Sequence, residues 1–243
     1  MKDGPNAKIN ALSTLFLDEP KLSIRTPLLL PRGENLVTEA KRDVEVKWMC
    51  EIGRELDLGL DTVGAAVSIF DHILTNLSVR FKYANCVATT ALYIAIKLLE
   101  ESLDSIALED VLADFQVNYS IQEVLRMERI ILSQLDWQLQ FPSVERFVFL
   151  MLAQLDNVIY VESNDLRKRI EDLLCNWNLM SSYRPSVLAS SLITVMANED
   201  ENGLIGLKVM ARMTQKFGID RNELRQCSSC LEDLFYDASD KEN

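Results

Sequence analysis

The chain has 243 residues, and its 37 acidic side chains against 25 basic ones give a formal net charge of −12. Hydrophobic residues make up 48% and charged residues 26%, the balance of a folded globular protein rather than a disordered one. A nucleic-acid-binding protein needs a basic face, so the overall charge argues against DNA or RNA as the main partner. The longest uncharged stretch near the centre, residues 83–96, is too short to cross a bilayer, and no secretory signal pattern opens the chain. We therefore expect a soluble protein of the nucleus, the cytoplasm or both, with no membrane partner.

The cysteines and the single histidine give no catalytic or metal-binding pattern. The five cysteines are odd in number and lack framework spacing, which predicts reduced thiols: Cys50, Cys86, Cys175, Cys227 and Cys230. The pair Cys227 and Cys230 cannot complete a tetrahedral zinc site alone, and His72 is far away in sequence. A structural role for this pair is favoured over metal or redox chemistry. With no glycine-rich phosphate loop either, the sequence predicts no enzyme and no cofactor.

Residues 1–35 are predicted to form a separate, irregular N-terminal arm. Four of the six prolines lie there, and they are expected to prevent a continuous helix: Pro5, Pro20, Pro27 and Pro31. The apolar run of residues 26–31 favours an arm that packs against the core. An alternative that stays open for Thr26-Pro27 is a phosphorylation site for a proline-directed kinase.

From residue 36 onward, hydrophobic periodicity predicts one helix after another. The expected helices of the first half are 36–56, 60–77, 80–99, 108–115 and 121–135. In 36–56, apolar residues four apart place Val44, Trp48 and Ile52 on one face. The segment 80–99 is apolar almost all round with alanine at spacings of three and four, so it is predicted to be the buried central helix. Ser120 and Glu123 are spaced as a capping box.

The second half repeats the pattern of helices without a residue-level repeat. The expected helices are 144–155, 165–179, 185–197, 205–216 and 221–235, and no segment alternates with period two. These elements predict an all-α fold with two consecutive five-helix bundles. The predicted boundaries are 36–141 and 142–237, followed by a polar tail at 238–243.

Several motifs in the middle of the chain resemble the cyclin box. They are Val67–Leu74 with Asp71, Ala91–Lys97 followed by Glu100 and Glu101, Val124–Glu128, and Trp137. The resemblance covers about 40–150 well and the second half more weakly. Arg42–Lys47 and Tyr183–Ala189 are similar to segments of the cyclin G and cyclin I group. The resemblance implies a cyclin fold.

The same resemblance implies a regulatory subunit that binds and activates a cyclin-dependent kinase. In the family, a lysine that ends one helix and a glutamate two helices later contact the kinase, and by position these match Lys97 and Glu128. Without the resemblance, Lys97 would be interpreted as a helix-terminal cation and Glu128 as a solvated residue or local ion-pair partner. Arg42 and Asp71 match a family pair that ties two helices together, which we interpret as structural.

One family feature is changed in this sequence. The substrate-docking patch of many cyclins matches a set of positions here: Val44, Glu45, Trp48, Glu51, Ala84 and Asn85. Glu45 places a carboxylate where an apolar pocket needs leucine, so we expect no binding of the usual basic and hydrophobic motif. Another substrate or regulator peptide at Trp48 stays open, as does core packing of this side chain. An alternative function is a scaffold in a cell-cycle, meiotic or DNA-repair assembly without kinase activation.

Overall fold

The computed structural model describes residues 5–22, 30, 32–100, 112, 113, 115, 117–155, 163–198 and 204–240. The chain folds into two compact units. The 28–141 unit comprises Leu28–Phe141 and Leu174–Trp177, and the 142–243 unit comprises the remainder, including helix α1 near the N-terminus. Within the described residues, every regular element is a helix, apart from one β-bridge between Leu36 and Arg80. The all-α prediction is confirmed, and none of the described helices is both long and apolar enough to span a membrane.

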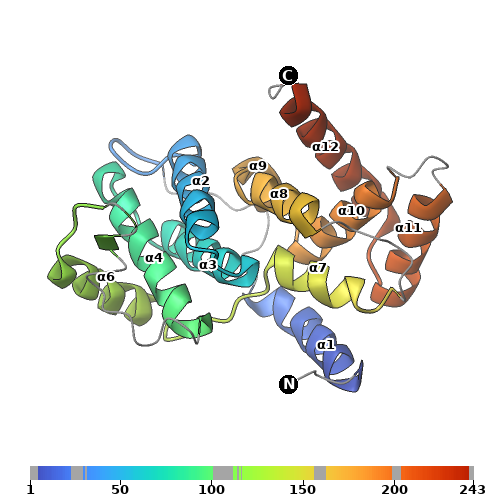
Figure 1. The fold of residues 1–243 in the computed structure, drawn as a ribbon, viewed down its shortest axis with the longest axis horizontal. Coiled ribbons are helices and arrows are strands. Elements are labelled where there is room, and N and C mark those ends of the chain that lie inside the picture. The colour runs from blue at the N-terminus through green and yellow to red at the C-terminus, as the bar shows by residue number, and fades with distance from the viewer. Residues whose placement is uncertain are drawn as a thin grey trace. The chain divides into compact units, whose positions relative to one another are not determined.

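The 28–141 unit is built around one central helix (Figure 1). Its described helices are α2 (Glu39–Glu55), α3 (Leu60–Asn76), the 3-10 turn η1 (Phe81–Tyr83), α4 (Ala84–Leu99) and α6 (Ile121–Gln134). Helix α4 packs against α2, α3 and α6. The alanines that recur along α4 are fully buried and leave room for these neighbours: Ala84, Ala88, Ala91 and Ala95. The predicted central helix is therefore confirmed.

Local capping fixes the ends of two helices in this unit. The Ser120 side chain accepts a hydrogen bond from the Glu123 amide, while Glu123 accepts one from the Ser120 amide at 2.9 Å, which confirms the capping box at the start of α6. Glu100, just after α4, accepts hydrogen bonds from the Gly59 amide and the Thr62 hydroxyl at the start of α3. The predicted helix 108–115 lies largely outside the described residues.

The 142–243 unit is built around helix α10. Its helices are α7 (Val144–Leu152), α8 (Ser163–Leu174), α9 (Trp177–Ser182), α10 (Pro185–Asn198), α11 (Leu204–Phe217), α12 (Arg221–Asp240) and α1 (Pro5–Leu22). The residues at the junction of α8 and α9, Leu174–Trp177, belong to the 28–141 unit. Almost every residue of α10 is buried, and it packs against α7, α11 and α12. Helix α12 continues to Asp240, beyond the predicted end at Phe235.

Helix α1 differs from the irregular arm expected for residues 1–35. Its two prolines lie near its ends. Pro5 is the first helical residue, and Pro20 is in the last turn. A proline at the first position loses no intrahelical bond, so the intervening residues remain free to form a helix. Phe16 of α1 packs between Phe147 of α7 and Phe217 of α11, with ring centroids 5.0 and 6.1 Å away.

The predicted helix 165–179 is divided into α8 and α9. The break has a long-range cause, because two backbone groups at the break bind side chains of α2. The Leu174 carbonyl accepts a hydrogen bond from Arg42, and the Trp177 amide donates one to Asp43 at 3.1 Å. Side chains 132 or more residues away thus replace the intrahelical partners of these groups.

Candidate functional site

Lys97 and Glu128 lie together at the surface of the 28–141 unit. Lys97 is in the last turn of α4 and Glu128 is near the middle of α6. Lys97 Nζ donates a hydrogen bond to Glu128 Oε1 at 2.6 Å. The Lys97 side chain is 50% exposed and that of Glu128 only 11%. The pair therefore presents an exposed cation above a mostly buried carboxylate.

The charge state of Lys97 follows from its neighbours. Burial alone would lower its pKa, but the hydrogen bond to Glu128 and the charge of this carboxylate outweigh burial, so the pKa of Lys97 is raised. Its Nζ also lies 5.0 Å from the centroid of the Tyr93 ring, one turn earlier on α4. Sequence reasoning missed Tyr93, although its spacing of four residues from Lys97 is a signal that could have identified it. Lys97 is thus held in its charged form at neutral pH.

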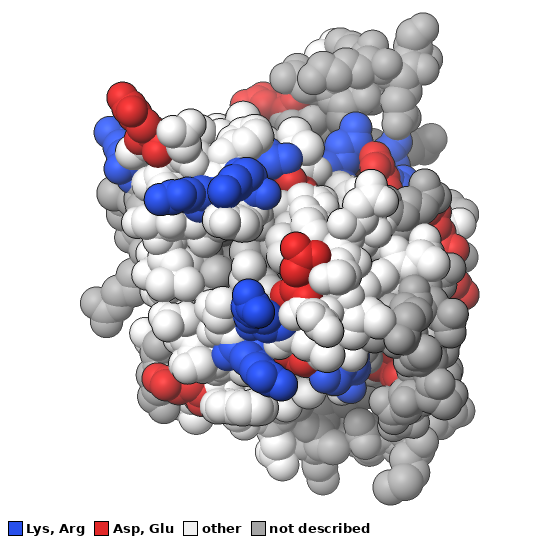
Figure 2. All heavy atoms as spheres, turned by 90° about the vertical axis from the view of Figure 1, so that its left-hand side faces the viewer, with Lys and Arg blue, Asp and Glu red and all other residues white. Residues whose placement is uncertain are grey.

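Apolar side chains accompany this pair in sequence and on the surface. Leu98 and Leu99, which directly follow Lys97, are each 41% exposed. Figure 2 views the molecule from the side on which α6 lies and shows broad uncharged areas between groups of Lys and Arg side chains. Exposed leucines beside a fixed charge suit a protein-binding surface, since they combine an apolar contact with a polar one that fixes its orientation.

Arg42 and Asp71 form a buried ion pair between α2 and α3. Arg42 Nε donates to Asp71 Oδ1 at 2.8 Å, and Nη2 donates to Asp71 Oδ2 at 2.6 Å. Nη1 donates to Asp43 Oδ1 and to the Leu174 carbonyl, and the guanidinium lies 5.3 Å from the Trp177 ring. Burial would lower the pKa of Arg42, but the charge of Asp71 outweighs it and raises the pKa. Because Arg42 is completely buried, we interpret the pair as a structural connection between α2 and α3.

The positions that match the family's docking patch do not form an apolar pocket. Glu45 is buried, forms a salt bridge with Lys41 and accepts a hydrogen bond from Asn85 Nδ2 at 2.8 Å. The carboxylate therefore occupies the place expected for leucine and is satisfied internally. Val44, expected on the same face as Trp48 and Ile52, is 59% exposed, because Arg42, Glu45 and Val46 occupy inward positions of α2.

The other members of this set have ordinary structural positions. Ala84 is buried and Glu51 is exposed. Trp48 is half-buried and meets the buried ring of Phe115 edge-on, with centroids 5.9 Å apart. His72, which is not one of these positions, stacks on Phe141 with ring centroids 3.7 Å apart.

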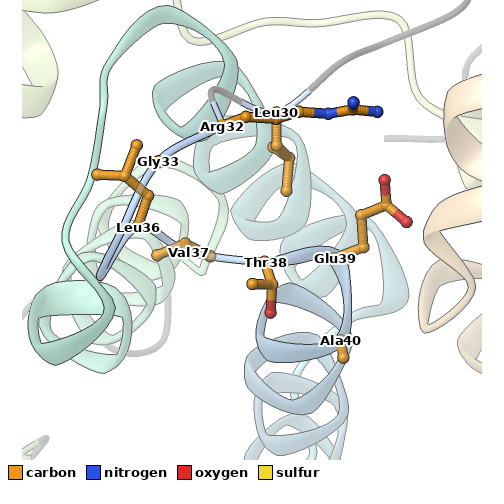
Figure 3. Close-up of a pocket in the computed structure, with 8 residues that line it drawn as sticks. All are labelled: Leu30, Arg32, Gly33, Leu36, Val37, Thr38, Glu39 and Ala40. Atoms are coloured by element: carbon orange, nitrogen blue, oxygen red, sulfur yellow. The ribbon is translucent and has the colours of Figure 1, made fainter.

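A separate pocket of about 380 Å³ lies at the start of α2 (Figure 3). Its lining comes from one short segment: Leu30, Arg32, Gly33, Leu36, Val37, Thr38, Glu39 and Ala40. Figure 3 shows Leu30 pointing into the space, with Arg32 and Glu39 extending to the same side of it. Thr38 caps α2 by accepting a hydrogen bond from the Lys41 amide. None of the candidate site residues lines this pocket.

Comparison with known proteins shows the family of the chain. The family described as "Cyclin, N-terminal domain" matches residues 12–140. Cyclin-G1 of Mus musculus is 27% identical over 164 residues, which cover 65% of this chain and 56% of that protein. The chain thus spans about half the length of several of the curated relatives that it matches.

Two solved structures share the fold. A viral cyclin from herpesvirus saimiri superposes with a TM-score of 0.64 at 16% identity, covering 92% of this chain and 97% of the other. A chain of the yeast TFIIK (Kin28/Ccl1/Tfb3) complex gives a TM-score of 0.60 at 19% identity, with 91% and 93% covered. The chain belongs to the cyclin family, and its cyclin box is close to that of cyclin G.

Proposed function

We propose that this cyclin is the regulatory subunit of a cyclin-dependent protein kinase, which it binds and activates through the surface around Lys97 and Glu128. The observation that carries the proposal is the 2.6 Å bond between an exposed lysine and a mostly buried glutamate, beside the exposed Leu98 and Leu99. A protein kinase is active only when its mobile regulatory helix brings a glutamate to the ATP-site lysine. A rigid surface that binds only this arrangement shifts the kinase population towards activity.

The comparisons support a regulatory role within an assembly. The TFIIK structure contains a chain of this fold in a complex of several named subunits. The helix that carries Lys97 is also held rigidly, because α4 is the buried centre of its unit. Because the bond to Glu128 already restricts the Lys97 side chain, less of its rotamer entropy is lost when it binds.

The test is co-purification with a panel of cyclin-dependent kinases, followed by a phosphorylation assay. Three variants are compared with the wild type: Lys97→Glu, Glu128→Lys and the double exchange. Each single variant places like charges together, whereas the double exchange can restore an internal ion pair with reversed polarity. We expect all three to lose at least about tenfold in kinase affinity, or about 1.4 kcal/mol. Circular dichroism and unfolding curves check that each variant is folded.

The double exchange separates an interface from a purely internal pair. Recovery of both stability and kinase binding in the double variant would show that the two residues matter only to each other. Recovery of stability without kinase binding supports the interface. If no kinase co-purifies with the wild type, the proposal is wrong.

A scaffold without kinase activation is the second candidate function. It is favoured by the altered docking patch, where Glu45 is buried and bonded to Lys41 and Asn85 in place of an open apolar pocket. In the same experiment, stoichiometric capture of a kinase without any rise in its activity would identify this function.

A further inference from the structure

Helix α11 carries a basic stripe in a strongly acidic protein. Lys208, Arg212 and Lys216 recur every four residues, all three are exposed, and α11 contains no acidic residue. At the helical repeat they lie within about 80° of one another on the outward face. Val209 and Met213 are buried on the side of α11 next to Lys216. The stripe therefore faces solvent in the 142–243 unit.

The cations on this face are not neutralised by carboxylates of the described residues. Arg212 Nη1 donates to the Leu155 carbonyl at 3.2 Å, and Lys216 Nζ donates to the Gln154 carbonyl at 2.9 Å. These carbonyls just follow α7, so each bond only partly offsets a full positive charge. Two further cations are Lys208 of α11 and Arg221, the first residue of α12. Neither forms a salt bridge in the part of the chain that the structure describes.

Apolar grooves border the same helix. One groove of about 180 Å³ is lined by Leu207, Met210, Ala211, Thr214, Gln215 and Arg221. Leu207 at its edge is 58% exposed. A second groove of about 500 Å³ begins at Lys216 and Phe217 and continues along Leu12, Phe16 and Leu17 of α1. The outward face of α11 thus has a basic half beside an apolar half.

We propose that the exposed surface centred on Leu207, Lys208 and Arg221 binds an acidic amphipathic segment of a partner protein. Large apolar side chains of the segment enter the groove beside Leu207, and its carboxylates pair with Arg221, which lines this groove, and with Lys208, which follows Leu207. The apolar half distinguishes this ligand from nucleic acid, which would need cations and stacking aromatic rings instead. The face belongs to a different unit from Lys97 and Glu128, so the proposal is independent of kinase binding.

The experiment selects 16-residue peptides from a random display library on the full chain. Counter-selection uses two variants of the face, Leu207→Ser and Lys208→Glu/Arg221→Glu. None of these side chains makes a hydrogen bond within the described residues that folding would lose. Lys47→Glu, which reverses an exposed cation on α2, is the matched control. Enriched peptides are then titrated by fluorescence anisotropy, alongside duplex DNA and phosphatidylserine vesicles.

We expect enriched peptides to carry Glu or Asp between large apolar residues spaced three and four apart. Their affinity should fall about tenfold in each face variant, stay unchanged in Lys47→Glu and weaken with added salt. Enrichment of neutral or basic peptides, or equal binding to the face variants, would overturn the proposal. Tighter binding of DNA or vesicles that is lost in Lys208→Glu/Arg221→Glu would overturn it too, because the face would then serve another class of ligand.

Discussion

Arg42 shows how a single buried cation is made tolerable. Its guanidinium meets both oxygens of Asp71, one oxygen of Asp43 and the Leu174 carbonyl, so each of its nitrogens has an acceptor. Taking the two charges out of water costs several kcal/mol, and their attraction repays this only when the geometry is good. The pair therefore adds little net stability, but loss of one partner leaves the other charge buried and alone.

We predict that Arg42→Met lowers the free energy of unfolding by about 3–5 kcal/mol, because Asp71 is left as an unpaired buried charge. The double variant Arg42→Met/Asp71→Leu should be less destabilised than the sum of the two single variants. Urea unfolding followed by circular dichroism measures all three. Additive effects would show that the two side chains do not interact energetically.

At Lys97 the pairing can be measured directly through its protonation. Glu128 raises the pKa of Lys97 against the opposing effect of burial, so the Glu128→Gln variant should show a lower pKa for this ammonium. Because the folded-state pKa is raised, the contribution of the pair is present below the unfolded pKa of about 10.4 and is lost as the pH rises through the folded value. Carbon-detected NMR titration of the lysine Cε resonance reports this pKa. An unchanged value in Glu128→Gln would contradict the observed bond.

Among the elements, α1 is attached to its unit through one carboxylate as well as through apolar packing. Glu19 is 2% exposed and accepts hydrogen bonds from the Ser186 amide and hydroxyl, both at 2.7 Å. Ser186 lies in the first turn of α10, where amides lack intrahelical partners. Glu19 thus caps α10 from another helix. Leu12 and Leu15 are buried on the same side of α1 as Glu19.

This cap predicts a pH dependence for the docking of α1. Burial raises the pKa of Glu19, and the hydrogen bonds from Ser186 only partly lower it again. Because an acid with a raised folded-state pKa binds its proton more tightly when folded, α1 docking should weaken as the pH rises from the unfolded pKa, near 4.3, through the folded value. Hydrogen exchange of α1 amides should show this trend, and Glu19→Gln should abolish it. The same trend in Glu19→Gln would assign it to another group.

The sequence predicted most helices because their apolar periodicity is local. Segments such as 60–77 and 121–135 match α3 and α6, and the capping box of Ser120 and Glu123 needs only neighbouring residues. The break between α8 and α9 could not be predicted in this way, since Arg42 and Asp43 stabilise it from distant positions. Similarly, Val44 is exposed because polar residues with partners on other helices occupy the inward face of α2.

The candidate site was partly predictable from sequence for the same reason. Matching motifs identified Lys97 and Glu128, but not that the two side chains bond to each other or that Tyr93 lies beside Lys97. Whether they contact a kinase stays a prediction. The α11 face had no motif at all, because its significance depends on grooves formed with residues of other helices.

For the whole molecule, the formal charge of −12 overstates how acidic the surface is. Among the described residues, six acidic side chains are buried against a single basic one: Glu19, Glu45, Asp71, Glu128, Glu145 and Glu171, against Arg42. Several of these carboxylates accept internal hydrogen bonds and are unavailable to partners. The exposed surface can therefore include basic faces such as that of α11, which composition alone does not indicate.

The two compact units also predict how destabilisation spreads through the chain. All the bonds that Arg42 forms lie within the 28–141 unit, whereas Glu19 binds Ser186 within the 142–243 unit. If each unit opens cooperatively by itself, a local defect raises exchange only in its own unit. Hydrogen exchange mass spectrometry of Arg42→Met should show about 100-fold faster exchange in α2, α3 and α4 for a loss of about 3 kcal/mol, with α10 unchanged. Glu19→Ala should accelerate α1 and the first turn of α10 and leave α4 unchanged. Acceleration of both units by either substitution would show instead that the chain unfolds as one cooperative body.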